Sequence, residues 1–134
     1  MTVLREIYFL LGVTLVLWSA CVGYGANESE PVRIAYVGGL TGNFGQAAQK
    51  SLKALQMVAR EFNASGGIRG RAIEILPYDT KFSPVTNISI FNNILKSGAV
   101  AITGIHASND GLILGELAEK HHLPMMVASC NGDK

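Results

Sequence analysis

The fold is decided by one stretch, Tyr36-Val37-Gly38-Gly39-Leu40-Thr41-Gly42-Asn43-Phe44-Gly45, in which an apolar run ends in glycines and an amphipathic helical pattern begins at once. Glycines let the backbone turn sharply and approach a ligand closely, and a helix start presents backbone N–H groups with a partial positive charge. Such a place suits a small anionic or polar molecule, and the same glycines also fit a plain tight turn. Gly39, Gly42 and Gly45 recur every third residue, which matches neither the dinucleotide fingerprint nor the phosphate loop. A nucleotide site is therefore not predicted.

Strand and helix patterns alternate along the chain. Apolar strand patterns lie at residues 32–37, 72–78, 99–103 and 125–128, and helical patterns lie at residues 45–63, 84–97 and 110–121. Ser83 and Pro84 open the second helix, and Ser108 or Asn109 can cap the third. The expected buried stripes are Ala48, Leu52, Leu55, Val58 and Phe62, then Ile88, Phe91 and Leu95, then Ile113, Leu114, Leu117 and Ala118. Because the connections are too long for hairpins, the pattern predicts an α/β fold, with a parallel sheet covered by helices on both faces.

The first segment reads as an export signal. Residues 7–24 carry no charge, Arg5 precedes them and small residues follow, so residues 1–26 are predicted to be a signal peptide, with an uncleaved membrane anchor as the alternative. Cys21 follows Ser19 and Ala20, as in a bacterial lipoprotein signal, but Trp18 stands where leucine is usual. Lipidation of Cys21 and ordinary cleavage near residues 23–26 both stay open.

The rest of the chain has the size of one small domain. Residues 27–31 form a polar linker, and residues 32–134 are enough for a single core. Lys and Arg number 11 against 10 Asp and Glu, so no basic excess points to nucleic acid.

Several short motifs occur in a fixed order between residues 38 and 124. They are Gly38-Gly39-Leu40-Thr41-Gly42, Asn63-Ala64-Ser65-Gly66-Gly67-Ile68-Arg69-Gly70-Arg71, Pro84, Thr103-Gly104 and Leu123-Pro124. In these motifs the sequence from residue 32 onward resembles the type I periplasmic solute-binding proteins, particularly the leucine-binding-like branch that binds branched-chain amino acids. The resemblance implies that residues 32–134 are the N-terminal part of one of two α/β lobes, which close on a small molecule by a hinge motion. We expect such a partial lobe to bind its solute weakly when it is alone.

The resemblance also implies a set of ligand-binding residues. The family's amino-acid binders hold the ligand carboxylate at the start of the third helix, and the ammonium after the fourth strand. Carried over by position, these contacts and a first-loop aromatic fall on Phe44, His106, Ala107, Ser108, Ser129 and Asn131. Four positions depart from the family: Asn131 replaces a threonine, Gly39 replaces a proline, and Val127-Ala128 replaces a Ser-Pro pair. Leucine or a relative is therefore one candidate ligand, and an amide or a urea-like solute is another.

The predicted function is solute binding outside the cytoplasm. By resemblance, the protein is the binding component of an ABC-type transporter, with a membrane permease and an ATPase as partners, in the periplasm or on the outer side of a membrane. An extracellular ligand-sensing receptor domain of the same fold is the alternative. No nucleophile–base–acid set stands out, so we expect no enzyme. We also expect no cofactor and no metal, because His121 and His122 are adjacent on a helix end and point in different directions.

Overall fold

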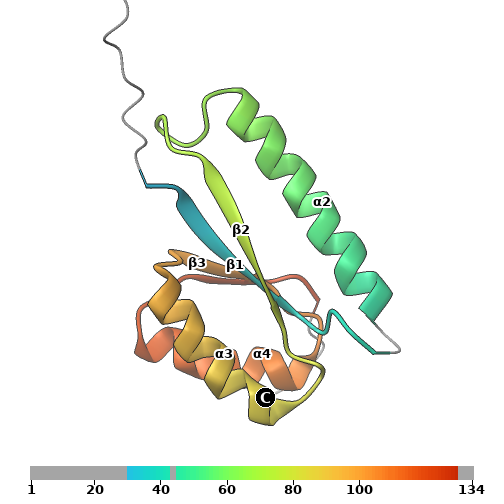
Figure 1. The fold of residues 1–134 in the computed structure, drawn as a ribbon. Coiled ribbons are helices and arrows are strands. Elements are labelled where there is room, and N and C mark those ends of the chain that lie inside the picture. The colour runs from blue at the N-terminus through green and yellow to red at the C-terminus, as the bar shows by residue number, and fades with distance from the viewer. Residues whose placement is uncertain (1–29, 43–44, 130–134) are drawn as a thin grey trace, which may run out of the picture.

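The structure, a computed structural model, describes residues 30–42 and 45–129 and has the predicted alternation of strands and helices (Figure 1). The described elements are β1 (Val32–Gly38), α2 (Gly45–Ala64), β2 (Ile73–Asp79), α3 (Pro84–Ser97), β3 (Ala101–Gly104), α4 (Ser108–Lys120) and β4 (Met125–Val127). Every predicted boundary agrees with the structure to within two residues. Ser83 lies at the N-cap of α3 with Pro84 behind it, as predicted, although the serine side chain makes no capping hydrogen bond.

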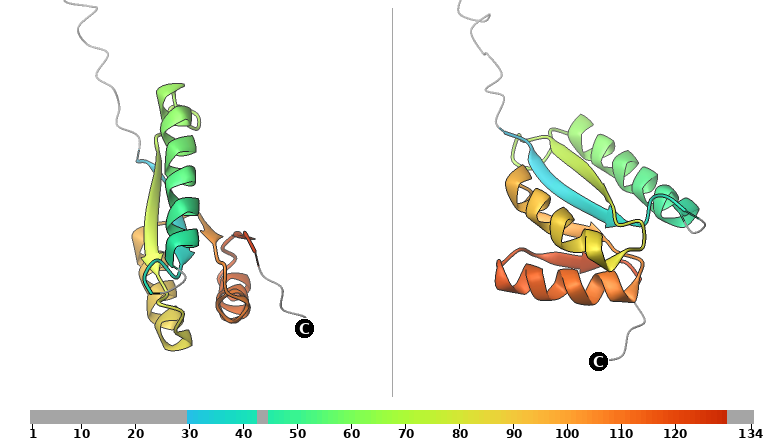
Figure 2. Two further views of the ribbon diagram at one scale, coloured as in Figure 1. Left: turned by 90° about the vertical axis from the view of Figure 1, so that its right-hand side faces the viewer. Right: turned by 60° about the horizontal axis from the view of Figure 1, so that its bottom comes forward.

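The described strands form one parallel sheet in the order β2-β1-β3-β4. The chain moves outward from β1 to β2 and then crosses back over β1 to reach β3. Because such crossovers are right-handed, the two directions place their helices on opposite faces of the sheet. Accordingly, α2 lies on one face, and α3 and α4 lie on the other (Figure 2). The predicted parallel sheet with helices on both faces is confirmed.

The main core lies between the sheet and the α3–α4 face. Phe91 and Ile94 of α3 and Leu114 and Ala118 of α4 are buried there against Ala35, Val37 and Ile102 of the strands, with Ile90 and Ile105 beside them. The α4 stripe is as predicted: Leu114 and Ala118 are buried and Ile113 and Leu117 half-buried.

The predicted stripe of α3 is correct at Phe91 and wrong at its other two positions. Ile88 and Leu95 are exposed to 60% and 38%, whereas the buried line runs through Asn87, Ile90, Phe91 and Ile94. Both lines have helical spacing, so spacing cannot choose between them. The line that is buried in the structure begins at Asn87. This asparagine is buried because it has a partner on α4, and the local sequence pattern does not show that partner.

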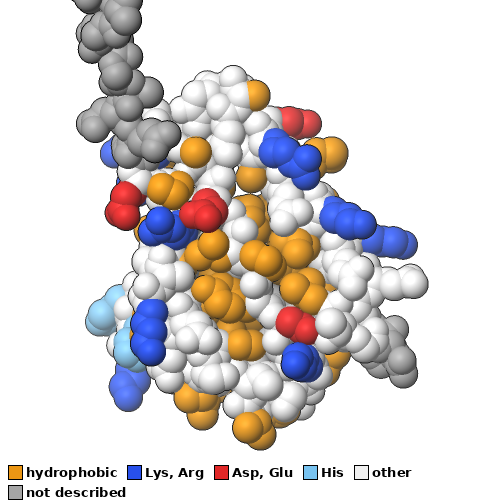
Figure 3. Space-filling view, in the orientation of Figure 1, with side chains coloured by type: hydrophobic (Ala, Val, Ile, Leu, Met, Phe, Trp, Pro, Cys, Tyr) orange, Lys and Arg blue, Asp and Glu red, His pale blue; other side chains and the backbone are white. Residues whose placement is uncertain are grey.

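The predicted stripe of α2 is correct only in its first half. Ala48 is buried and Leu52 and Leu55 are half-buried, but Val58 and Phe62 are exposed. The buried line continues through Ala59, whose small side chain lets the helix lie close to the sheet. Hydrophobic side chains gather over β2 between α2 and α3 in the view of Figure 3.

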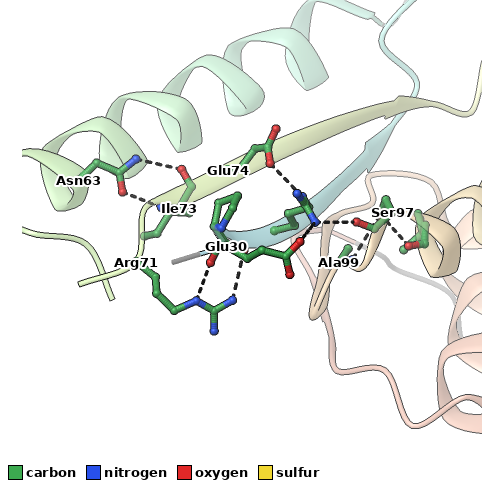
Figure 4. Close-up of polar contacts among 10 residues, drawn as sticks. Glu30, Asn63, Arg71, Ile73, Glu74, Ser97 and Ala99 are labelled. Atoms are coloured by element: carbon green, nitrogen blue, oxygen red, sulfur yellow. Dashed lines mark hydrogen bonds and ion pairs between the residues drawn. The ribbon is translucent and has the colours of Figure 1, made fainter. Parts of the chain in front are cut away.

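The free edge of β2 is closed at its start. The Asn63 amide Nδ2 donates to the carbonyl oxygen of Ile73 at 2.9 Å, and the Ile73 backbone N–H donates to Asn63 Oδ1 at 2.7 Å (Figure 4). On the same strand, Glu74 accepts a hydrogen bond from Arg33 of β1 at 3.1 Å. Further along β2, Pro77 has no backbone N–H to offer a neighbouring strand.

The α2 side of the sheet is only partly covered. An apolar hollow of about 350 Å³ lies beside α2 over β1, β3 and β4, and Ile34, Leu55, Ala101, Thr103, Met125 and Met126 are among its lining residues. Met126 and Val127 of the edge strand β4 are exposed to 72% and 40%. None of the described helices is both long and apolar enough to cross a bilayer.

Candidate functional site

The carboxyl ends of β1, β3 and β4 meet at one edge of the sheet. Val37 pairs with Gly104, and Gly104 pairs with Val127. The hydrogen bonding continues beyond the strands, since the backbone N–H of Ala128 donates to Gly104 at 2.9 Å and that of Ser129 donates to Ile105 at 3.4 Å. The loop after β4 therefore runs beside the loop after β3. In open parallel sheets ligands bind at this edge.

The structure brings four of the predicted site residues to this edge. His106, Ala107 and Ser108 follow β3, and the N–H···O contact of Ser129 with Ile105 places Ser129 next to them. Phe44, Asn131 and Cys21 lie outside the described residues.

The bend after β3 requires an unusual backbone. Gly104 has φ 102°, and a Cβ there would lie 2.5 Å from the carbonyl oxygen of Val37. The next residue, Ile105, has φ 45°, which is strained for a β-branched side chain. Burial of Ile105 and its 2.6 Å N–H bond to the Val37 carbonyl oxygen hold it in place. Such strained residues cluster at ligand sites, and sequence reasoning did not single this one out.

Ser108 is the first residue of α4, so its predicted role as helix cap is wrong. The N-cap is Ala107, in extended conformation, and its carbonyl oxygen accepts the first helical bond from Gly111 at 3.0 Å. Ser108 still lies in the first turn, where backbone N–H groups of a helix point outward and favour an anion.

Tyr36 joins the first helix to the residues after β3. Its hydroxyl lies 2.8 Å from the carbonyl oxygen of Ala48 and 3.1 Å from His106 Nε2, and the tyrosine is 1% exposed. Burial raises the pKa of Tyr36, and a hydrogen bond with Ser51 offsets part of this rise. The phenol therefore keeps its proton at neutral pH. Sequence reasoning missed this residue, because a tyrosine in an apolar strand gives no sign of what its hydroxyl meets.

Asp79 holds the glycine-rich loop after β1. Its carboxylate accepts hydrogen bonds from the Leu40 backbone at 2.7 Å, the Lys81 backbone at 3.0 Å, and the Thr41 hydroxyl at 2.7 Å. Burial alone raises the pKa of Asp79, but hydrogen bonds from the Thr41 side chain and from the backbone of Lys81, Leu40 and Thr41 lower it below its usual value. These contacts fix the loop beside the candidate site.

The glycine at position 39 has a structural reason. A Cβ on Gly39 would lie 2.2 Å from Cε2 of Phe82, so the Phe82 ring lies directly against the backbone of this loop. A proline, which is usual here in the family that the sequence resembles, would meet the same ring. The position of the Phe82 ring therefore explains why glycine replaces the family's proline at position 39.

A buried acid lies behind the start of α4. Asp110 is 3% exposed and accepts a 2.8 Å hydrogen bond from Asn87 Nδ2 of α3. A negative charge in the first turn stabilises the helix dipole, and it also opposes an anion at the same helix end. Among the described residues, no group of three or more His, Cys, Asp or Glu side chains is placed to hold a metal ion.

Comparisons with known proteins agree with this geometry. A family model described as periplasmic binding protein matches residues 31–134. The Leu/Ile/Val-binding protein of Escherichia coli (strain K12) is 25% identical over 91 residues, which are 66% of this chain and 25% of that protein. The chain thus spans about a quarter of the length of the curated relatives it matches.

Solved structures give the same result. LivJ, the branched-chain amino acid transporter substrate binding protein from Streptococcus pneumoniae, was solved with isoleucine and superposes with a TM-score of 0.71 at 25% identity, over 77% of this chain and 30% of that one. A solute binding protein from R. palustris, solved with benzoate, superposes with a TM-score of 0.67 over 75% of this chain and 28% of that one; at 15% identity it shows the fold alone. The family match takes in every element from β1 to β4, so this chain belongs to the periplasmic binding protein family.

Proposed function

We propose that this chain is part of the extracytoplasmic solute-binding component of an ABC-type transporter and carries one wall of its binding site. One observation supports this above the others: the start of α4, with His106, Ala107 and Ser108, lies beside Ser129 at the carboxyl edge of a parallel sheet. These are the positions at which the family resemblance places the ligand contacts. A membrane permease and an ATPase are the partners that this function implies.

The proposed ligand is a small solute with a carboxylate, such as a branched-chain amino acid. The S. pneumoniae relative was solved with isoleucine, which carries a carboxylate. The first turn of α4 offers the positive end of a helix dipole to such a group. We propose binding without turnover, since the named relatives are binding proteins.

The proposed location follows from the N-terminal segment. Residues 1–26 serve as the export signal, with Cys21 as the candidate lipidation site, and residues 32–134 form part of the N-terminal lobe. Mass spectrometry of the mature protein tests this proposal, because lipidation at Cys21 and cleavage near residues 23–26 give different N-termini.

Ser108→Ala tests the proposed site. We expect it to weaken leucine or isoleucine binding by the complete two-lobed protein about ten- to hundredfold, because a hydrogen bond to a charged group contributes roughly 1.5–3 kcal/mol. Ser89→Ala is the matched control, because Ser89 is an exposed serine of α3. Calorimetry that gives the same affinity for Ser108→Ala and wild type, with both proteins folded, would remove Ser108 from the site.

A further inference from the structure

The contacts of the Tyr36 hydroxyl determine what His106 can offer a ligand. A tyrosine hydroxyl has one hydrogen to donate and lone pairs that accept. The carbonyl oxygen of Ala48 can only accept, and its 2.8 Å distance is typical of O–H···O bonds. The single phenol hydrogen is therefore used on Ala48, and the lone pairs of the same oxygen are left for the Ser51 hydroxyl and for His106 Nε2, which lies 3.1 Å away.

We propose that Tyr36 holds neutral His106 in the tautomer that carries its proton on Nε2, so that Nδ1 presents a lone pair to the ligand. A neutral imidazole has one donor nitrogen and one acceptor nitrogen, and the hydrogen bond at one nitrogen decides the role of the other. With Nε2–H donating to Tyr36, Nδ1 is the acceptor. Tyr36 is thus a positioning residue that acts through His106.

This inference rests on the proposed function, which places His106 at the ligand, and it narrows the ligand class. An acceptor nitrogen suits an ammonium or amide N–H and does not suit a second carboxylate. Together with Ser108 in the first turn of α4, it favours a solute with an anionic group and an N–H donor, such as an amino acid. The raised pKa of Tyr36 supports the arrangement, because the phenol stays protonated.

The tautomer can be measured without any ligand. We expect long-range ¹H–¹⁵N NMR spectra of the full chain near pH 9 to show the His106 proton on Nε2. His121 and His122 are internal references, and His106→Gln identifies the His106 signals by their loss. A proton on Nδ1 of wild-type His106 would overturn the proposal.

Tyr36→Phe tests the cause. This variant removes the hydroxyl and keeps the ring that lies against Gly104. We expect the His106 proton to redistribute toward Nδ1, while His121 and His122 do not change. An unchanged tautomer in folded Tyr36→Phe would mean that the Tyr36 hydroxyl does not set the His106 tautomer. If the variant does not fold, the wild-type spectrum still decides whether the proton is on Nε2.

A second experiment tests the role toward the ligand, in the complete two-lobed protein. The probes are leucine and 4-methylpentanoate, which is leucine without its amine. His106→Gln keeps a donor at the position of Nε2 but loses the Nδ1 acceptor, so we expect it to weaken leucine about tenfold and 4-methylpentanoate less than twofold. Equal weakening of both probes contradicts the proposed ligand role. If wild type binds neither probe, the proposed leucine-like ligand and this ligand role are both wrong, whereas the tautomer is decided by the spectra alone.

Discussion

Asn87 Nδ2 lies 2.8 Å from Asp110 Oδ1, and this hydrogen bond joins α3 to the first turn of α4 in the interior. Asn87 is fully buried and Asp110 is 3% exposed. The other amide atom, Asn87 Oδ1, has no hydrogen-bond partner among the described residues. A buried polar pair depends strongly on both members, because removal of either one leaves the other buried without its partner.

Asn87→Leu should therefore destabilise the fold by about 1–3 kcal/mol, because it leaves the Asp110 carboxylate buried without this donor. Asn92→Leu, on the exposed side of the same helix, is the matched control and should stay within about 0.5 kcal/mol of wild type. In Asn87→Leu/Asp110→Leu the loss should be smaller than the sum of the two single losses. Urea unfolding at low protein concentration measures all four variants, and additive losses would show that the two side chains are not coupled.

This pair also shows where sequence reasoning stops. The alternation of elements, their boundaries and the sheet edge that carries the site follow from local patterns of apolar residues, glycine and proline. The side-chain contacts that shape the candidate site do not follow from such local patterns. Tyr36 and His106 are 70 residues apart, and Asp79 and Leu40 are 39 apart. Each pair meets only because β1 lies between β2 and β3, and no single segment carries a sign of that meeting.

The hydrogen bonds of Asp79 predict a pH dependence. The pKa of Asp79 is lower in the folded protein than in the unfolded chain, where it is about 3.9. Its contribution to stability is therefore fully present above the unfolded value and is lost as the pH falls through the lower folded value. We expect wild type to be more stable than Asp79→Asn at pH 7, and the difference to shrink below about pH 4.

Urea unfolding of both proteins from pH 7 to pH 3 measures this difference. Glu74→Gln is the control for an exposed carboxylate, whose ion pair with Arg33 should contribute little. A wild-type advantage over Asp79→Asn that is the same at both ends of the pH range would show that the carboxylate charge does not stabilise the loop.

Gly39→Ala should destabilise the loop after β1 by about 1 kcal/mol, because the new methyl group must displace the Phe82 ring. Phe82 is 39% exposed, so its ring has some room to move and the loss stays modest. In a Phe82→Ala background the same change at position 39 should cost clearly less. A double-mutant cycle gives the coupling, and the same loss in both backgrounds would mean that the ring does not explain the glycine.

One side of the sheet, beside α2, is only partly covered. The edge of β2 is closed by the Asn63 side chain and by Pro77, whereas β4 has exposed Met126 and Val127 beside the apolar hollow next to α2. Open strand edges and apolar faces promote association.

We therefore expect the isolated segment of residues 27–134 to associate through β4 as its concentration rises. We also expect it to bind leucine no better than about millimolar, because a single wall leaves much of a ligand in water. Met126→Lys should reduce association by placing a charge at the open edge, and Val85→Lys, at a strongly exposed apolar residue of α3, is the comparison. Sedimentation velocity measures association and calorimetry measures binding. A segment that stays monomeric at high concentration and binds leucine with micromolar affinity would be a complete binding module, and this prediction would be wrong.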